Sequence, residues 1–467
     1  MTGKKITCFL FSFFLLLNFL QAQDTLNEKL VDTNYKENKG KVSVSARAFF
    51  MNTINKGDLA DHTALGFGVG LKYETPSFKK FRLGIGGFAI YNVASTDLSS
   101  KDPLSGSANR YEIGLFDILD AGNKSNMYRL EELYLNYKTG KTSVHLGRQF
   151  LKTPFINLQD GRMRPTAEEG IWISSKDAVS WEFKGGGLWK ISPRSTVKWF
   201  SVDKSIGLYP SGVDENGKPS GYKDNLQSGG VGMASIKYKK NNFSLETWDV
   251  LIKNVLNTAM LQPEMEWTTK NGEKWITGLQ FIFQHGVGNG GNADHAKRYV
   301  NPGSKAFVIS SRIGVSMKKI NTNINYTRIT GDGRYLMPRE WGREPFYTFM
   351  PRERNEGFGD VHAVSANIEY TSEEGTNLSV GYGHFYLPDV KNYRLNKYGF
   401  PSYNQFNMGF EKKLDKLISG LEFQLLLIYK GRLGESYNDF KYIDNKVNML
   451  HGNLVINYSL NRSKNKL

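Results

Sequence analysis

Large apolar residues alternate with small or polar residues along many short segments of this chain. In residues 65–74, the odd positions from Leu65 to Tyr73 are large and apolar, and the even positions are glycine, lysine or glutamate. A period of two predicts a β-strand, because successive side chains point to opposite faces of a strand. Such a strand requires lipid or a protein core on one side and water on the other.

Eighteen segments with strand character follow one another between residues 42 and 460. The number is even, as is usual for an antiparallel barrel that crosses an outer membrane. The predicted strands are 42–51, 65–75, 81–91, 128–138, 142–149, 169–175, 179–189, 229–239, 243–253, 255–267, 275–285, 304–317, 321–329, 361–371, 377–387, 403–412, 419–432 and 447–460.

The connections alternate between short turns, such as 139–141, and long loops, such as 92–127 and 330–360. Periplasmic turns and extracellular loops alternate in this way, and only a closed sheet lets strands satisfy every backbone group in lipid. The join at Asn254 is a short exception. We place the strand-like stretch 195–202 inside the fourth long loop. The predicted fold class is therefore all-β, a transmembrane antiparallel β-barrel of about 18 strands.

The N-terminus carries Lys4 and Lys5, then an apolar run that ends at Leu20, then the small residue Ala22. This arrangement predicts a signal peptide over residues 1–22 and therefore export. Its Cys8 is the only cysteine, so the mature chain has neither disulfides nor thiol chemistry.

The remaining chain divides into a polar periplasmic leader over 23–41, a single barrel domain over 42–460 and a polar tail over 461–467. The localisation expected for such a chain is the outer membrane of a Gram-negative cell. Its predicted partners are outer-membrane lipid, lipopolysaccharide and small-molecule solutes. Nucleic acid is not expected, because the protein is exported.

The formal net charge of +16 favours anionic partners. Charge alone does not define a selective channel, because many lysines lie in the short turns, as at Lys239 and Lys240. The seven histidines show no metal-ligand spacing, and no cofactor motif stands in a suitable context, so neither a metal nor a cofactor is predicted.

The opposite phase of each strand is expected to face water inside the barrel, since 18 strands enclose an aqueous channel. We interpret Gly66, Gly68 and Gly70 as clearance for the pore or for a loop folded into it. The other inward positions include Arg47, Lys72, Glu74, Arg82, Arg312, Asn323, Asn325, Asn367, Glu369, Gln424, Lys430 and Arg432.

The third long loop is rich in charge and in turn-forming residues. If it folds inward, Asp160, Arg162, Arg164, Glu168 and Glu169 would create a transverse field that selects solutes by charge. The alternative is an exposed loop with surface ion pairs. The loop over 330–360 carries nearly balanced charges, which predicts internal pairing.

Three stretches resemble the OprD family of substrate-preferring outer-membrane porins. These are LGRQFLKTPFINLQDGRMRPTAEEGIWISS (146–175), NYTRITGDGRYLMPREWGREPFY (325–347) and the C-terminal ISGL and LVINYSL segments. The resemblance implies a monomeric eighteen-stranded barrel, with a constriction made by the third loop and assisted by the seventh. It also implies a ladder of basic residues that guides carboxylates.

Asp160, Arg162 and Arg164 match the loop motif of that family. Arg312 and Arg432 fit the basic ladder by strand phase, and Arg82 and Lys430 are further inward-facing candidates for solute binding. Gln424, Leu426 and Ile428 occupy inward positions of the penultimate strand, where the family has arginines, so the class of solute stays open.

The leading functional hypothesis is passive, selective diffusion of small anionic or zwitterionic solutes, such as carboxylates, amino acids or short peptides. One alternative is a secreted or surface β-rich binding protein, which the alternation of short turns and long loops disfavours. A second alternative is an outer-membrane barrel enzyme, although no local Ser, Asp and His arrangement marks one.

Overall fold

A computed structural model describes residues 40–158, 162–352 and 354–460. The predicted signal peptide, most of the leader, Asp160 and the polar tail lie outside these residues. Within the described residues, no helix has the length and apolarity needed to span a bilayer.

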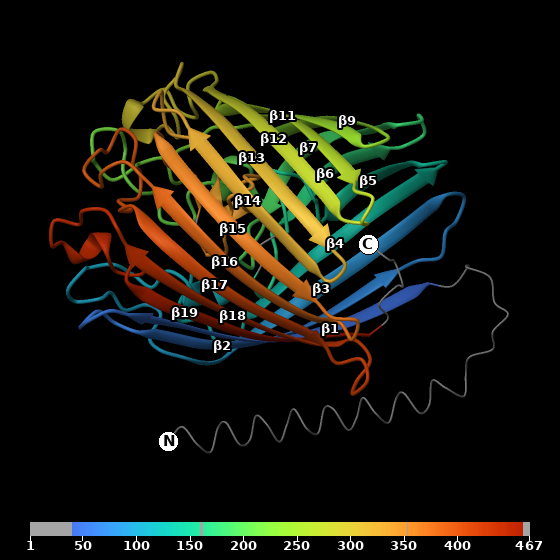
Figure 1. The fold of residues 1–467 in the computed structure, drawn as a ribbon, viewed down its shortest axis with the longest axis horizontal. Coiled ribbons are helices and arrows are strands. Elements are labelled where there is room, and N and C mark those ends of the chain that lie inside the picture. Colours follow the sequence, from blue (N-terminus) through green and yellow to red (C-terminus); the bar gives the residue numbers. More distant parts are fainter. Residues whose placement is uncertain (1–39, 159–161, 353, 461–467) are drawn as a thin grey trace. The chain divides into compact units, whose positions relative to one another are not determined.

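The described residues form nineteen strands and five short 3-10 helices (Figure 1). The helices are η1 Glu112–Leu115, η2 Asp203–Ser205, η3 His295–Lys297, η4 Arg339–Trp341 and η5 Phe440–Tyr442. The strands are β1 Lys41–Asn55, β2 His62–Glu74, β3 Phe81–Ser95, β4 Met127–Thr139, β5 Thr142–Gln149, β6 Ala167–Ser175, β7 Trp181–Ser192, β8 Phe200–Ser201, β9 Val231–Lys240, β10 Phe243–Ile252, β11 Leu256–Thr268, β12 Lys274–Gly286, β13 Lys305–Met317, β14 Ile320–Ile329, β15 Val361–Thr371, β16 Thr376–Tyr386, β17 Tyr403–Lys413, β18 Leu421–Arg432 and β19 Met449–Leu460.

Eighteen of these strands close into a single antiparallel ring. β1 pairs with β2 on one side and with β19 on the other, from Val44 opposite Leu460 to Asn55 opposite Met449. The two-residue β8 pairs only with the end of β7, while β7 continues the ring to β9. The predicted fold is confirmed, and residues 195–202 lie in a loop as expected.

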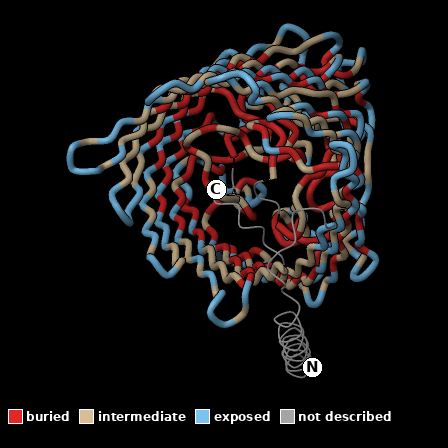
Figure 2. The backbone as a smooth tube through the Cα atoms, turned by 90° about the vertical axis from the view of Figure 1, so that its right-hand side faces the viewer, coloured by how far each residue is buried: buried red, intermediate tan, exposed pale blue. Residues whose placement is uncertain are grey.

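Long loops gather at one end of the barrel and short turns at the other. We number the loops of the long-loop end L1 to L9 in chain order. Those used below are L2 (96–126), L3 (150–166), L4 (193–230), L6 (287–304), L7 (330–360) and L8 (387–402). Figure 2 shows buried backbone inside the ring of strands, so part of the loop chain folds into the barrel.

The two faces of the wall differ as the alternation predicts. Outward side chains such as Leu71, Ile85, Phe307 and Met408 are exposed apolar groups, as a lipid-facing band requires. Buried apolar residues of the wall pack instead against the inward loops, with Ile156 of L3 and Trp341 of L7 in the largest cluster. The core of this protein therefore lies within the barrel.

The inward glycines of β2 leave room for bulky neighbours. A Cβ atom on Gly66 would lie 3.2 Å from Sδ of Met163 in L3 and 3.2 Å from Cε1 of Phe116 in L2. A Cβ atom on Gly68 or Gly70 would overlap the ring of Phe88 on β3. The prediction that these glycines clear space for an inward loop is confirmed at Gly66.

Gly68→Val is expected to destabilise the barrel by about 1–3 kcal/mol, because the new side chain overpacks against Phe88. The matched control is Gly232→Val on β9, where a Cβ atom meets nothing within 4 Å. The unfolding temperature in detergent, read from heat-dependent gel mobility, checks both. Equal temperatures for the two variants would contradict the packing argument.

Candidate functional site

L3 is fastened to L7 inside the barrel by hydrogen bonds that use the backbone of both loops. The backbone N–H of Asn157 donates to the carbonyl of Trp341 at 3.2 Å, and its Nδ2 donates to the carbonyl of Arg343 at 2.9 Å. The Arg343 N–H donates back to Asn157 Oδ1 at 3.1 Å. Thr166 Oγ1, at the end of L3, donates to the carbonyl of Glu340 at 2.7 Å. The two loops therefore form one unit.

L7 is in turn hydrogen-bonded to the barrel wall, and two glutamines of the wall contact its backbone. Gln284 of β12 accepts from the Leu336 N–H and donates to the Leu336 carbonyl, both at 2.8 Å. Gln405 of β17 donates through Nε2 to the carbonyl of Pro351 at 2.9 Å. These wall amides hydrogen-bond to the backbone of L7 and so fix its position.

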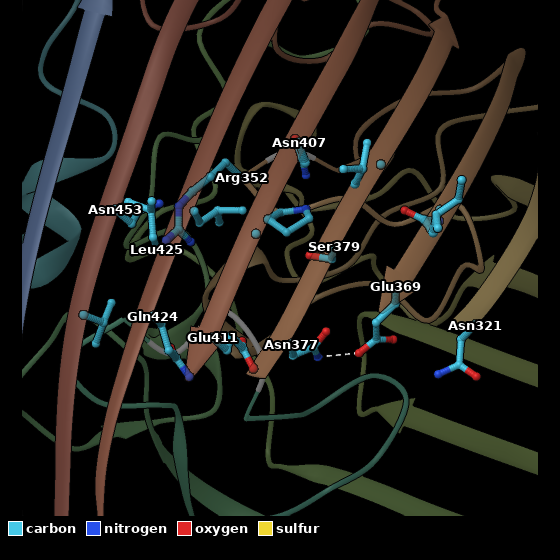
Figure 3. Close-up of a pocket in the computed structure, with 18 of the residues that line it drawn as sticks. Asn321, Arg352, Glu369, Asn377, Ser379, Asn407, Glu411, Gln424, Leu425 and Asn453 are labelled. Atoms are coloured by element: carbon cyan, nitrogen blue, oxygen red, sulfur yellow. Dashed lines mark hydrogen bonds between the residues drawn. The ribbon is translucent and has the colours of Figure 1, made fainter. Parts of the chain in front are cut away.

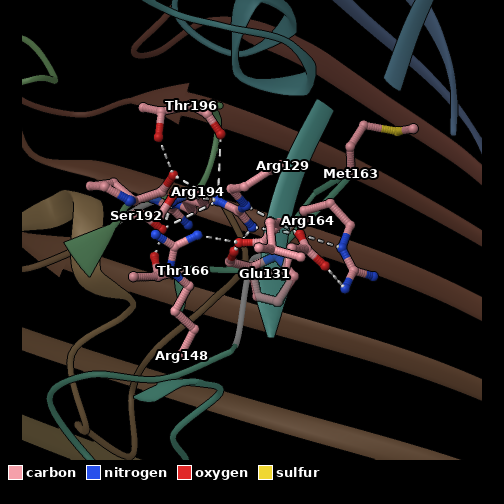
Figure 4. Close-up of polar contacts among 12 residues, drawn as sticks. Arg129, Glu131, Arg148, Met163, Arg164, Thr166, Ser192, Arg194 and Thr196 are labelled. Atoms are coloured by element: carbon pink, nitrogen blue, oxygen red, sulfur yellow. Dashed lines mark hydrogen bonds and ion pairs between the residues drawn. The ribbon is translucent and has the colours of Figure 1, made fainter. Parts of the chain in front are cut away.

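A triad of charged side chains, Arg129, Glu131 and Arg164, joins the end of L3 to β4 (Figure 4). Glu131 Oε1 accepts from Arg129 Nη2 and from Arg164 Nε, each at 2.8 Å. Arg129 also donates to the carbonyls of Pro165 at 2.7 Å and Ser192 at 3.2 Å, which joins L3 to the last residue of β7. The side chains of Arg129 and Glu131 are 3% exposed. A buried carboxylate flanked by two guanidinium groups thus fixes the end of the loop.

Arg162 of L3 and Arg352 of L7 both adopt left-handed backbone conformations, with φ of 48° and 74°. This region is uncommon for residues other than glycine and is often found at functional positions. The Arg162 carbonyl accepts from Arg47 Nη1, and Arg352 Nε donates to His451 Nε2 at 3.2 Å. Wall residues thus hold both arginines in place.

Two cavities share these arginines in their linings. The first, which we call the vestibule, has a volume of about 600 Å³ and lies among L2, L3, L4 and L7. The second, the inner cavity, has a volume of about 660 Å³ and is lined largely by the wall strands β14 to β19. Arg162 and Arg352 line both cavities.

Both basic and apolar side chains line the vestibule. Among its described lining residues none is acidic, and the apolar ones include Tyr111, Ile113, Leu119 and Leu208. Arg339 is also paired with Glu356, with 3.5 Å between Nε and Oε2. The basic lining residues are Arg110, Arg162, Arg194, Lys223, Arg339, Arg352 and Arg354.

The inner cavity combines arginines, amides and two carboxylates. Figure 3 shows Arg352 near one end of this group and Glu369 and Glu411 toward the other. Neutral hydrogen-bonding side chains make up much of the remaining lining. These are Asn321, Asn323, Asn367, Asn377, Ser379, Asn407, Gln424 and Asn453.

Two buried titratable side chains, Glu344 and Lys397, make contacts within and between the loops. Burial raises the pKa of Glu344 in L7 to about 7, and its Oε1 accepts from the Asn355 N–H at 2.8 Å. Burial lowers the pKa of Lys397 in L8 to about 8. Lys397 Nζ donates to the Tyr222 hydroxyl at 3.2 Å and lies 4.9 Å from the ring centre of Tyr299, which joins L8 to L4 and L6.

Three of the predicted site residues lie within or beside this region. Arg162 lines both cavities, and Arg164 is held in the ion triad with its guanidinium 4.4 Å from the Phe88 ring centre. Arg312 lies on the wall, 3.2 Å from Glu264 and 4.6 Å from the ring centre of Tyr347.

Arg82, Lys430 and Arg432 lie outside both cavities. Arg82 is an exposed residue at the start of β3, and Arg432 ends β18, where it donates to Ser436. Lys430 is buried and donates to the Tyr111 hydroxyl at 3.2 Å. All three side chains have the inward strand phase, which is compatible with a solute path. Strand phase alone, however, does not specify how far along the barrel a side chain lies or which other residues bury it.

The expected transverse field requires a correction. Glu169 belongs to β6, and it pairs with Arg148 of β5 at 2.9 Å on the outward face. Glu168 is fully buried and accepts from the Leu151 N–H at 3.0 Å. Neither carboxylate opposes Arg162 across the channel. The strand begins two residues earlier than predicted, which places both glutamates in the wall.

Sequence reasoning missed most of the vestibule arginines. Arg352 and Arg354 belong to L7, whose balanced charge predicted internal pairing, and the Arg339–Glu356 pair confirms part of that expectation. Arg110 and Arg194 lie in L2 and L4, where no periodic pattern indicates direction. The density of arginine in L7 was the one available signal.

Comparison with known proteins identifies the class. The sequence model described as "outer membrane porin, OprD family" matches residues 38–349, more than half of the chain. The chain therefore belongs to the OprD family of outer-membrane porins, and it is located in the outer membrane of a Gram-negative cell. A search of curated proteins found no match.

Several solved structures share the fold. Pseudomonas aeruginosa OccK9 (OpdG) is 14% identical with a TM-score of 0.69, covering 90% of this chain and 98% of that chain. P. aeruginosa OpdK, solved with vanillate, is 14% identical with a TM-score of 0.66 and the same coverages. Acinetobacter baumannii OccAB4 is 16% identical with a TM-score of 0.68, covering 91% and 99%. Family and fold are thus those of channels rather than of enzymes or secreted binding proteins.

Glu131→Gln is expected to destabilise the barrel by about 3–5 kcal/mol, since it leaves Arg129 buried without a carboxylate. The matched control is Glu266→Gln, whose 2.9 Å pair with Lys274 is largely exposed and contributes only about 0–1 kcal/mol. Thermal unfolding in detergent measures both, and protease digestion within L3 reports whether the loop loosens. A Glu131→Gln protein as stable as the control would show that the triad is dispensable.

Proposed function

We propose that this porin is a passive channel selective for small solutes that carry a carboxylate, including zwitterions such as amino acids and short peptides. The observation that carries this proposal is the shared position of Arg162 and Arg352 between the two cavities. A solute that moves from the vestibule to the inner cavity passes these two guanidinium groups. Guanidinium groups bind carboxylates through paired, charge-assisted hydrogen bonds.

The composition of the two cavities supports an ordered passage. The vestibule concentrates anions through its basic lining, because a cavity of one charge sign raises the local concentration of the opposite ion. The apolar residues beside the arginines suit the hydrocarbon part of an organic acid. OpdK, which shares the fold, was solved with vanillate, which is a carboxylate.

The inner cavity extends the proposal to zwitterions. Glu369 and Glu411 provide negative charge at a distance from the arginines, and the amides between them can both donate and accept hydrogen bonds. A solute with an ammonium group and a carboxylate can therefore interact at both ends of the cavity. The cavities form within one closed chain, which supports a monomer as the working unit.

Arg162→Glu and Arg352→Glu are each expected to shift selectivity from anions toward cations. The ratio of anion to cation permeability should fall on the order of tenfold, which corresponds to about 1.4 kcal/mol of lost interaction. The reversal potential of the channel in a planar bilayer under a potassium chloride gradient measures this ratio.

The matched control is Lys124→Glu, which makes the same charge change at an exposed position of L2 outside both cavities. Its reversal potential should equal that of the unmodified channel. An unchanged reversal potential in both arginine variants would refute the proposed passage. Uptake of labelled carboxylates and neutral sugars by proteoliposomes then ranks the solutes.

A further inference from the structure

We infer that the outer surface of β12–β16 binds the phosphorylated headgroup of lipopolysaccharide in the outer leaflet. Five consecutive strands each place one basic or imidazole side chain on the outward face, close to the long-loop end. We call this group the outer belt. Its members are His285, Lys305, Arg328, His362 and His384.

Strand pairing arranges these side chains in two neighbouring groups, because Arg328 is opposite Ile309, four positions along β13 from Lys305. His285 is directly opposite Lys305, and Arg328 is directly opposite His362. His384 is opposite Val364 and therefore diagonal to His362 on the same face. Lys305, His362 and His384 are exposed. Neighbouring outward residues of paired strands lie within reach of one another, so several belt members can contact a single headgroup.

The charge of these strands is distributed unevenly between their two ends. By alternation, no Asp or Glu occupies the outward phase of β12–β16. At the short-turn end the outward residues are neutral, as at Trp275, Met317, Ile320 and Tyr370. On the outward phase of these strands, positive charge therefore gathers at the long-loop end, where Lys305 and Arg328 lie.

The surroundings of the belt fit a lipid with a polar head and acyl chains. Tyr326 and His362 share a hydrogen bond of 2.8 Å between Oη and Nδ1, and the His362 and Tyr386 rings are 6.5 Å apart. Aromatic residues are typical of the headgroup level. Ile309, Ile324, Val364 and Tyr382 lie further along the same outward faces and are exposed for acyl contact.

Arg328 is held in place for this role. Its Nη2 donates to Asp360 Oδ1 at 2.6 Å and its Nη1 donates to the Val361 carbonyl at 3.3 Å. Asp360 lies in L7 and offsets part of the positive charge, while Lys305 and the three imidazoles remain as further donors. Arginine, lysine and imidazole together form the kind of set that binds phosphate oxygens.

The test measures binding of diphosphoryl lipid A to the full-length mature barrel in detergent by native mass spectrometry. The triple variant Arg328→Gln, His362→Gln, His384→Gln should weaken binding at least about tenfold, because uncharged amides replace one guanidinium group and two imidazole rings and lose the charge-assisted bonds to phosphate. The single variant His384→Gln, which breaks no ion pair, should weaken it about two- to threefold and serves if the triple variant does not fold.

The matched control is Lys318→Gln, which removes a cation at the short turn between β13 and β14. It should bind lipid A as the unmodified barrel does. Dephosphorylated lipid A and phosphatidylglycerol should each bind at least about tenfold more weakly than diphosphoryl lipid A. Equal affinity of the unmodified barrel and His384→Gln, or equal binding of phosphatidylglycerol, would overturn the inference.

Discussion

The closure of the sheet is the constraint on which the rest of the molecule depends. A strand in a bilayer has no water to satisfy its N–H and C=O groups, so every strand must have two partners. The pairing of β1 with β19 supplies the last of these partnerships. Once eighteen strands are closed, their inner faces cannot meet across the lumen, and the barrel must be filled by water or by its own loops. The structural consequence is that L3 and L7 take the place of a conventional core.

Those inward loops need a different kind of stabilisation from the wall. Besides a few backbone hydrogen bonds of their own, side-chain amides and charges satisfy their backbone groups, as Asn157 does for L7 and Arg129 does for the end of L3. The same polar contacts that stabilise the loops also determine where their arginines lie. Arg162 and Arg352 keep left-handed backbones because neighbouring contacts hold them. Loop stability and the electrostatics of the channel are therefore one problem.

The wall could be predicted from the sequence, because its signal is local. A period of two indicates a strand and its two faces, and it correctly separated the lipid side of Leu71 from the inward glycines of β2. The site could be predicted only in part. The loop motif indicated Arg162, but Arg110 and Arg194 come from loops without periodicity, and their direction depends on contacts distant in sequence. Strand phase alone also suggested Lys430, although Tyr111 of L2 covers it. Strand phase predicts whether a side chain points inward or outward, whereas its position along the barrel and its burial by other residues depend on tertiary contacts.

The basic residues behind the net charge of +16 also differ in what they can contact, depending on where they lie in the molecule. Lysines beside the short turns, such as Lys239 and Lys240 at the end of β9, are exposed to water, and a passing solute interacts with them only through screened, long-range fields. The arginines of the vestibule act at close range in a confined space, where a charge is worth several times more. Basic groups on the outward face of β12–β16 meet the headgroups of the outer leaflet rather than the solute. One overall charge thus divides into three populations, and under the proposed function the basic groups inside the barrel, from the loops and from Arg47 of β1, bear on selectivity.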